Sequence, residues 1–149
     1  MRLLALLITA VAALPILADA PQDDGVKKEL KKLQGTWATV SIEAAGEKVT
    51  DKDKIKARKL TIKGDKYTLK VGDEMVQGTI EINPTRKPKR IDVKPNTGSN
   101  KGKTSLGIYE LKGDNLKICL GPPGKERPTE FATQAEAAQQ LVVYKREKP

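Results

Sequence analysis

The chain contains no histidine and a single cysteine, Cys119, among its 149 residues. Without histidine, neither a Ser-His-Asp nor a Cys-His nucleophile system can be assembled, and nearly all zinc sites lose a usual ligand. One cysteine alone cannot form an intramolecular disulfide, so the stability of the fold has to come from an apolar core. The sequence therefore predicts no catalytic constellation, no metal site and no cofactor.

Aromatic residues are also scarce, since the chain has one tryptophan, three tyrosines and one phenylalanine. Lysine and arginine total 28 against 19 aspartates and glutamates, which gives a formal net charge of +9. A positive charge attracts anionic partners, but proteins that bind single-stranded nucleic acid also stack bases on aromatic side chains. We therefore expect no nucleic-acid partner and interpret the lysines as a solvating surface coat.

A long apolar run occurs only at the N-terminus. Residues 1–20 carry Arg2, then an apolar stretch, and end in Ala18-Asp19-Ala20, which has the small-x-small form of a signal-peptidase site. The stretch is shorter than the roughly twenty residues that cross a bilayer, although an uncleaved anchor is the alternative. The prediction is a bacterial signal peptide cleaved near Ala20, with export to the periplasm or the extracellular space and no membrane span in the mature chain.

The remainder, residues 21–149, has the size of one domain. Val26, Leu30 and Leu33 recur at helical spacing, which predicts a short N-terminal helix within residues 21–34. From Gly35 onward apolar residues recur at every second position, which is typical of strands with one buried face. These runs predict eight strands, at about residues 35–44, 57–63, 66–71, 74–82, 89–94, 104–112, 115–120 and 139–147.

Three Gly-Asp dipeptides, at 64–65, 72–73 and 113–114, separate alternating runs. Gly-Asp suits a two-residue hairpin turn whose first central residue has positive φ. Counting outward from these turns brings Tyr67, Leu69, Tyr109 and their apolar partners to one face and the lysines to the other. Because a shift of one residue would turn the apolar face to water, the agreement between hairpins predicts their register.

Gly35-Thr36-Trp37 on the first strand is similar to the G-x-W signature of lipocalin-type barrels. Most of the mature chain resembles a family of small exported bacterial lipocalin-like domains of unknown function, through the stretches "LQGTW", "INPTRKPKRIDV", "GKTSLGIYELKGDNLKIC", "RPTEF" and a terminal "KRE". The resemblance implies an all-β fold, an eight-stranded antiparallel meander barrel over residues 35–149. It also implies that Trp37, after Gly35, closes one barrel end and that a basic residue of the last strand, Arg146, covers it. It implies no activity.

Five residues are candidates for ligand binding: Trp37, Tyr67, Tyr109, Arg127 and Glu130. The two tyrosines face inward in the predicted register. Arg127 and Glu130 belong to a long loop, where they form either an ion pair that pins the loop across the barrel mouth or a site for a ligand carboxylate or phosphate. The serines and carboxylates stand in no catalytic motif, so we expect no enzyme activity.

Cys119 falls on the face opposite the predicted core. It is either covered by a loop and inert, or it forms with Leu106 and Ile108 a small apolar patch for self-association. The expected state is accordingly a monomer or a weak homodimer.

Two functions remain open from the sequence. In the first, an exported non-enzymatic barrel binds a small apolar or anionic molecule at its open end. In the second, a filled barrel serves as a structural or interaction module whose basic surface contacts an envelope component. The two differ in whether the inward side chains leave a cavity.

Overall fold

The computed structural model describes residues 20–148, so the predicted signal peptide lies outside the described residues except for Ala20. Two helices and nine strands follow one another along these residues. Their bounds are α1 Ala20–Leu33, β1 Gly35–Ala44, β2 Glu47–Lys48, α2 Lys52–Lys56, β3 Arg58–Lys63, β4 Lys66–Val71, β5 Glu74–Asn83, β6 Lys89–Pro95, β7 Ser105–Lys112, β8 Asn115–Leu120 and β9 Gln140–Arg146. Neither α1 nor α2 has the length and apolar character of a membrane-crossing helix.

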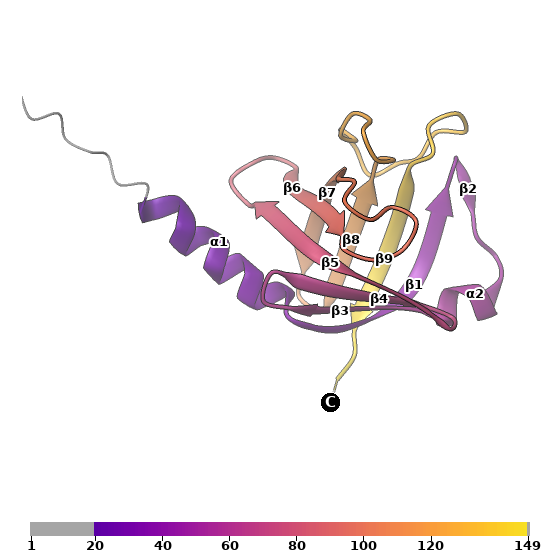
Figure 1. Cartoon of the computed structure of the whole chain (residues 1–149), viewed down its shortest axis with the longest axis horizontal. Coiled ribbons are helices and arrows are strands. Elements are labelled where there is room, and N and C mark those ends of the chain that lie inside the picture. Colours follow the sequence, from indigo (N-terminus) through magenta and orange to yellow (C-terminus); the bar gives the residue numbers. More distant parts are fainter. Residues whose placement is uncertain (1–19, 149) are drawn as a thin grey trace, which may run out of the picture.

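The sheet is an antiparallel meander that closes on itself, and the predicted eight-stranded barrel is confirmed (Figure 1). Each strand from β3 to β9 pairs with the next along the chain. Closure comes from β1, which pairs with β3 through residues 35–38 and with β9 through residues 37–44. Full closure leaves no long unpaired edge that could recruit another chain.

The three Gly-Asp turns set the register as predicted. Gly64, Gly72 and Gly113 have φ values of 64°, 62° and 58°, whereas the aspartate that follows each of them keeps negative φ. This combination is the type II′ turn, whose twist matches that of the flanking strands. The observed partners Tyr67 and Ile62, and Tyr109 and Ile118, are those that the count from the turns requires.

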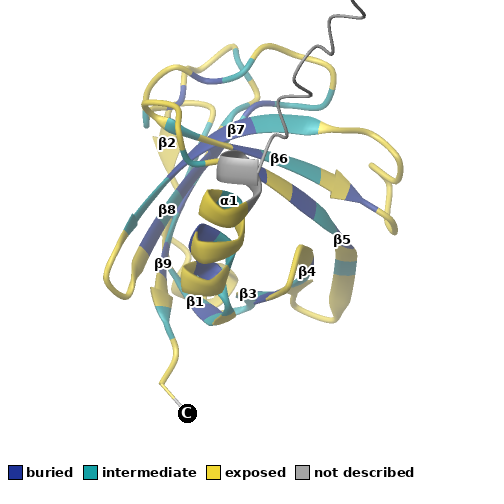
Figure 2. Cartoon of the chain, turned by 90° about the vertical axis from the view of Figure 1, so that its left-hand side faces the viewer, coloured by how far each residue is buried: buried dark blue, intermediate teal, exposed yellow. Residues whose placement is uncertain are grey.

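Helix α1 lies across one end of the barrel (Figure 2). Leu33 is buried, and Val26 and Leu30 pack against the same apolar core, which confirms the predicted helical face. We refer to this end as the closed end. The opposite end, which carries the 72–73 turn and the connections 96–104 and 121–139, is the open end.

Strand β2 and helix α2, two short elements near the open end, were not predicted. After Ala38, β1 diverges from β3 and bulges between Thr39 and Ser41. Helix α2 contacts both strands there, and its residue Ile55 packs against the core. The side chain of Asp51 caps α2 by accepting from the backbone N–H groups of residues 53 and 54. Such a short helix carries little periodicity, which explains why the sequence pattern missed it.

The connection 121–139 folds over the outer face of the barrel. The segment contains turns, bends and irregular backbone, and no helix. It covers Cys119, which is fully buried and whose Sγ donates to the carbonyl of Ala132 over 3.6 Å. Burial raises the pKa of the Cys119 thiol, opposed by that hydrogen bond and aided by Glu43. Of the two alternatives, the covered thiol is the one observed.

Candidate functional site

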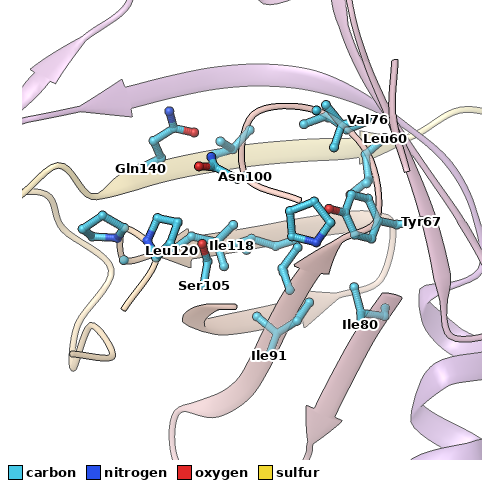
Figure 3. A pocket seen from close by; sticks show the side chains of 18 of the residues that line it. Leu60, Tyr67, Val76, Ile80, Ile91, Asn100, Ser105, Ile118, Leu120 and Gln140 are labelled. Atoms are coloured by element: carbon cyan, nitrogen blue, oxygen red, sulfur yellow. The ribbon is translucent and has the colours of Figure 1, made fainter. Parts of the chain in front are cut away.

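The barrel interior contains a cavity of about 350 Å³. Apolar side chains from β3, β4, β5, β6, β8 and β9 form most of its wall, as Figure 3 shows for Leu60, Tyr67, Val76, Ile80, Ile91, Ile118 and Leu120. Ligand pockets generally have volumes of about 300–1,000 Å³ and mainly apolar walls with a few polar groups, and this cavity falls at the lower end of that range. The inward side chains therefore do not fill the barrel.

The open end of the cavity is bordered by two loops. Residues 97–100 of the connection 96–104 line the cavity, as do residues 121–123. The first loop is tied to β5, since the backbone N–H of Gln77 donates to the Thr97 hydroxyl over 3.0 Å and the N–H of Asn96 donates to the carbonyl of Gln77 over 2.7 Å. These bonds hold a polar, glycine-rich segment at the mouth of an apolar chamber.

Tyr67 is the one predicted ligand-binding residue that lines this cavity. Its ring lies against Gly78, where an added Cβ would be 2.8 Å from Tyr67 Cε1. Burial raises the pKa of the Tyr67 hydroxyl to about 12, so the hydroxyl stays protonated at neutral pH. Tyr67 thus contributes both apolar surface and a neutral hydroxyl to the wall.

Trp37 belongs to the closed end and is fully buried. Its indole Nε1 donates to the carbonyl of Leu33 over 3.0 Å, and the guanidinium carbon of Arg146 lies 4.2 Å from the ring centroid. Arg146 also donates to the carbonyls of Lys32 and Gln34 at the end of α1, so it joins the helix to the tryptophan. The predicted closure by Gly35, Trp37 and Arg146 matches this arrangement, since Gly35 has φ of 120° and lies against Arg146.

Tyr109 also belongs to the closed end, where it anchors α1 and does not line the cavity. Its hydroxyl donates to Glu29 Oε1 over 3.2 Å, and Lys89 Nζ lies 2.5 Å from the same oxygen. Burial would raise the pKa of Glu29, but hydrogen bonds and charge from Lys89, with Lys32 and Tyr109, lower it overall. Burial and the Glu29 charge both raise the pKa of Tyr109.

The anchoring of α1 should weaken in acid. A carboxylate with a lowered pKa in the folded state adds stability above its unfolded pKa, near 4.5, and that stability is lost as the pH falls through the folded value. Replacing Glu29 with glutamine should cost about 1–3 kcal/mol at neutral pH and flatten the acid dependence. Urea unfolding of both proteins between neutral pH and acid measures this.

Glu110→Gln, which removes an exposed partner of Lys112, is the control and should change stability by less than about 0.5 kcal/mol. Equal acid dependence in wild type and the Glu29 variant would contradict the assignment.

Arg127 and Glu130 do not form the predicted ion pair. Arg127 Nη1 lies 2.5 Å from Asp92 Oδ1 and also donates to the carbonyls of Ile91 and Gly107. These contacts fix the loop to the outer face of β6 and β7, because Asp92 alternates with the inward Ile91 and Val93. Neither Arg127 nor Glu130 lines the barrel cavity. Proximity in sequence suggested Glu130 as the partner of Arg127, whereas the fold brings Asp92 closer to the guanidinium.

Among the polar residues of the cavity wall that the sequence interpretation missed are Arg58, Gln140 and Tyr144. Arg58 has the same alternation as Leu60 and Ile62, so the strand pattern already directs its side chain inward. The prediction assigned the strand lysines to the solvent face and gave Arg58 no place.

Among the described residues, no group of three histidine, cysteine or carboxylate side chains could hold a metal ion. Comparisons of the chain with protein-family models, with curated proteins and with solved structures found no match.

Proposed function

We propose that this protein is a binding barrel that holds a small, mainly apolar molecule in its interior. The observation that carries the proposal is the cavity of about 350 Å³ with mainly apolar walls that opens between two loops. Moving apolar surface of a ligand from water into such a chamber contributes roughly 25 cal/mol per Å². Trp37 and Leu33 are buried at the other end, where α1 packs against the core, and this leaves the open end as the route by which a ligand reaches the cavity.

The alternative function, a structural or interaction module of the cell envelope, rests on a filled barrel with a basic surface. A cavity in the ligand-sized range favours binding over this alternative. Export after cleavage near Ala20, the lipocalin-like family resemblance and the lack of enzyme activity form part of the proposal. They rest on the sequence features given above.

Filling the cavity tests this proposal. Leu69 lines the cavity, whereas its neighbour Lys70 is exposed on the outer face of β4. Leu69→Trp should weaken binding of the neutral fluorescent probe N-phenylnaphthylamine at least about tenfold, and Lys70→Trp should leave it unchanged. Titrations followed by probe fluorescence measure both.

The free energy of unfolding of the Leu69→Trp variant distinguishes a hollow barrel from a filled one. In a hollow barrel the added ring of Leu69→Trp occupies free space, so the free energy of unfolding should stay within about 1 kcal/mol of wild type. In a filled barrel the same ring would overpack the core and cost about 1–3 kcal/mol. Absence of probe binding to wild type, together with a destabilised Leu69→Trp, would overturn the binding function and favour the structural module.

A further inference from the structure

Arg58 occupies an unusual place in the cavity wall. It begins β3 and points inward in the same alternation as Leu60 and Ile62. Every other residue that lines the cavity is uncharged. The barrel interior therefore contains one fixed positive charge in a largely apolar surface, close to the open end.

The guanidinium of Arg58 is not fully satisfied by the protein. Its Nε is buried and, among the described side chains of residues 24–148, is the one buried nitrogen or oxygen without a hydrogen-bond partner. Its Nη2 donates to Gln140 Oε1 over a long 3.5 Å, and its side chain also forms a hydrogen bond with the Tyr144 hydroxyl. No carboxylate of the described residues forms an ion pair with it. A buried donor without an acceptor costs about 1–3 kcal/mol, so such a group calls for a physical explanation.

Two donors of Arg58, the unpartnered Nε and the weakly bonded Nη2, are arranged to receive two oxygens. Nε and Nη2 lie on the same edge of the planar guanidinium, and this edge matches the two oxygens of a carboxylate. Tyr144 lies beside it in the cavity wall. Burial raises the pKa of the Tyr144 hydroxyl, opposed by the charge of Arg58 and by a hydrogen bond between the two side chains, so the hydroxyl stays protonated at neutral pH.

From this arrangement we propose that the ligand is an aliphatic monocarboxylate whose carboxylate binds Arg58 and whose chain lies in the apolar cavity. The inference rests on the proposed binding function and names its ligand class. Arg58 and Gln140 begin their strands at the open end, so the head group lies near the mouth. The chain extends toward Ile62 and Ile80, which line the deeper part of the cavity.

The cavity wall favours a ligand with one negative charge over a neutral ligand or a dianion. A neutral alcohol would leave the Arg58 edge without a charged acceptor and would forgo the charge-assisted bonds. A dianionic phosphate ester would bring a second charge into a wall that contains no second cation, and an uncompensated charge is costly in an apolar site. A monocarboxylate gives Arg58 a charged acceptor and brings no second charge into the wall.

The test is competition against N-phenylnaphthylamine by dodecanoate, dodecanol and dodecyl phosphate, each below its critical micelle concentration. We expect wild type to bind dodecanoate roughly 10–100-fold more tightly than dodecanol, the range that bonds to a charged group provide, and more tightly than dodecyl phosphate. Arg58→Met should reduce this preference to less than about threefold. Lys59→Met removes the same charge from the adjacent outward position, where Lys59 pairs with Glu147, and should retain the wild-type preference.

The outcomes separate the two proposals. If the probe does not bind wild type, the binding function fails, and the ligand class fails with it. If the probe binds but dodecanoate and dodecanol compete equally, the cavity binds apolar molecules and the Arg58 inference alone is overturned. Preference for dodecyl phosphate would overturn it too. Thermal unfolding tests a structural role: Arg58→Met should unfold within a few degrees of wild type, and a large loss would show that Arg58 supports the fold.

Discussion

Replacing Trp37 with alanine should lower the free energy of unfolding by about 3–5 kcal/mol, the usual cost of truncating a fully buried large aromatic residue. The loss has three sources. The cavity left by the indole removes packing at the closed end, and the carbonyl of Leu33 loses its donor. Arg146 also loses the ring on which it stacks, a contact worth about 0.5–2 kcal/mol. Because Arg146 also bonds the end of α1, the helix should loosen with the tryptophan.

Chemical unfolding followed by circular dichroism measures this effect, because Trp37 is the only tryptophan and the alanine variant has no indole fluorescence. Trp37→Phe is the matched control. It keeps most of the buried ring but lacks the indole N–H, so it should cost clearly less than alanine. If the free energy of unfolding of Trp37→Ala fell by less than about 1 kcal/mol, the stability of the closed end would not depend on the Trp37 side chain.

Replacing Gly78 with alanine should be destabilising by about 3 kcal/mol or more, because strand β5 has no room for a Cβ at this position. The added atom would lie 2.3 Å from the carbonyl oxygen of Lys94 and 2.7 Å from Cα of Pro95. Both belong to the backbone of the paired strand β6, which moves only if the ladder shifts. The same Cβ would lie 2.8 Å from the Tyr67 ring, so the variant should also disturb the cavity wall.

Gly25→Ala is the control for this substitution. Gly25 lies in α1 with no heavy atom within 4 Å of an added Cβ, so alanine should be neutral or stabilise the helix by up to about 1 kcal/mol. Urea unfolding of both variants, with probe binding of the Gly78 variant, provides the comparison. A Gly78 variant as stable as wild type would mean that β5 and β6 pair differently from the arrangement described.

The sequence predicted the barrel well because its strongest signals are local. Each Gly-Asp turn fixes the pairing of the two strands beside it, and alternation then decides which side chains face inward. Tyr67 opposite Gly78 and Tyr109 opposite Ile118 followed from counting alone. The role of Arg146 over Trp37 followed from the resemblance to lipocalin-type barrels, and the observed contact of 4.2 Å agrees with it.

The site was harder to predict because it depends on distances across the barrel. No local pattern shows whether the inward side chains meet at the centre or leave a cavity, since this depends on barrel diameter and on how α1 fills one end. The partner of Arg127 is Asp92, 35 positions away in sequence, and only the fold brings them together. Arg58 could have been recognised from its place in the alternation, but its free Nε follows from the positions of Gln140 and Tyr144 on a distant strand.

Isoleucine methyl spectra during a titration with dodecanoate test the central claim most directly, namely that the barrel is hollow and takes an apolar guest. Ile62, Ile80, Ile91 and Ile118 line the cavity, whereas Ile108 is buried on the outer face beneath the 121–139 connection. We predict saturable chemical-shift changes in the four cavity methyls, with Ile108 nearly unchanged. Saturating changes at Ile108 alone, or no change in the four cavity methyls at concentrations that saturate the protein, would contradict the account.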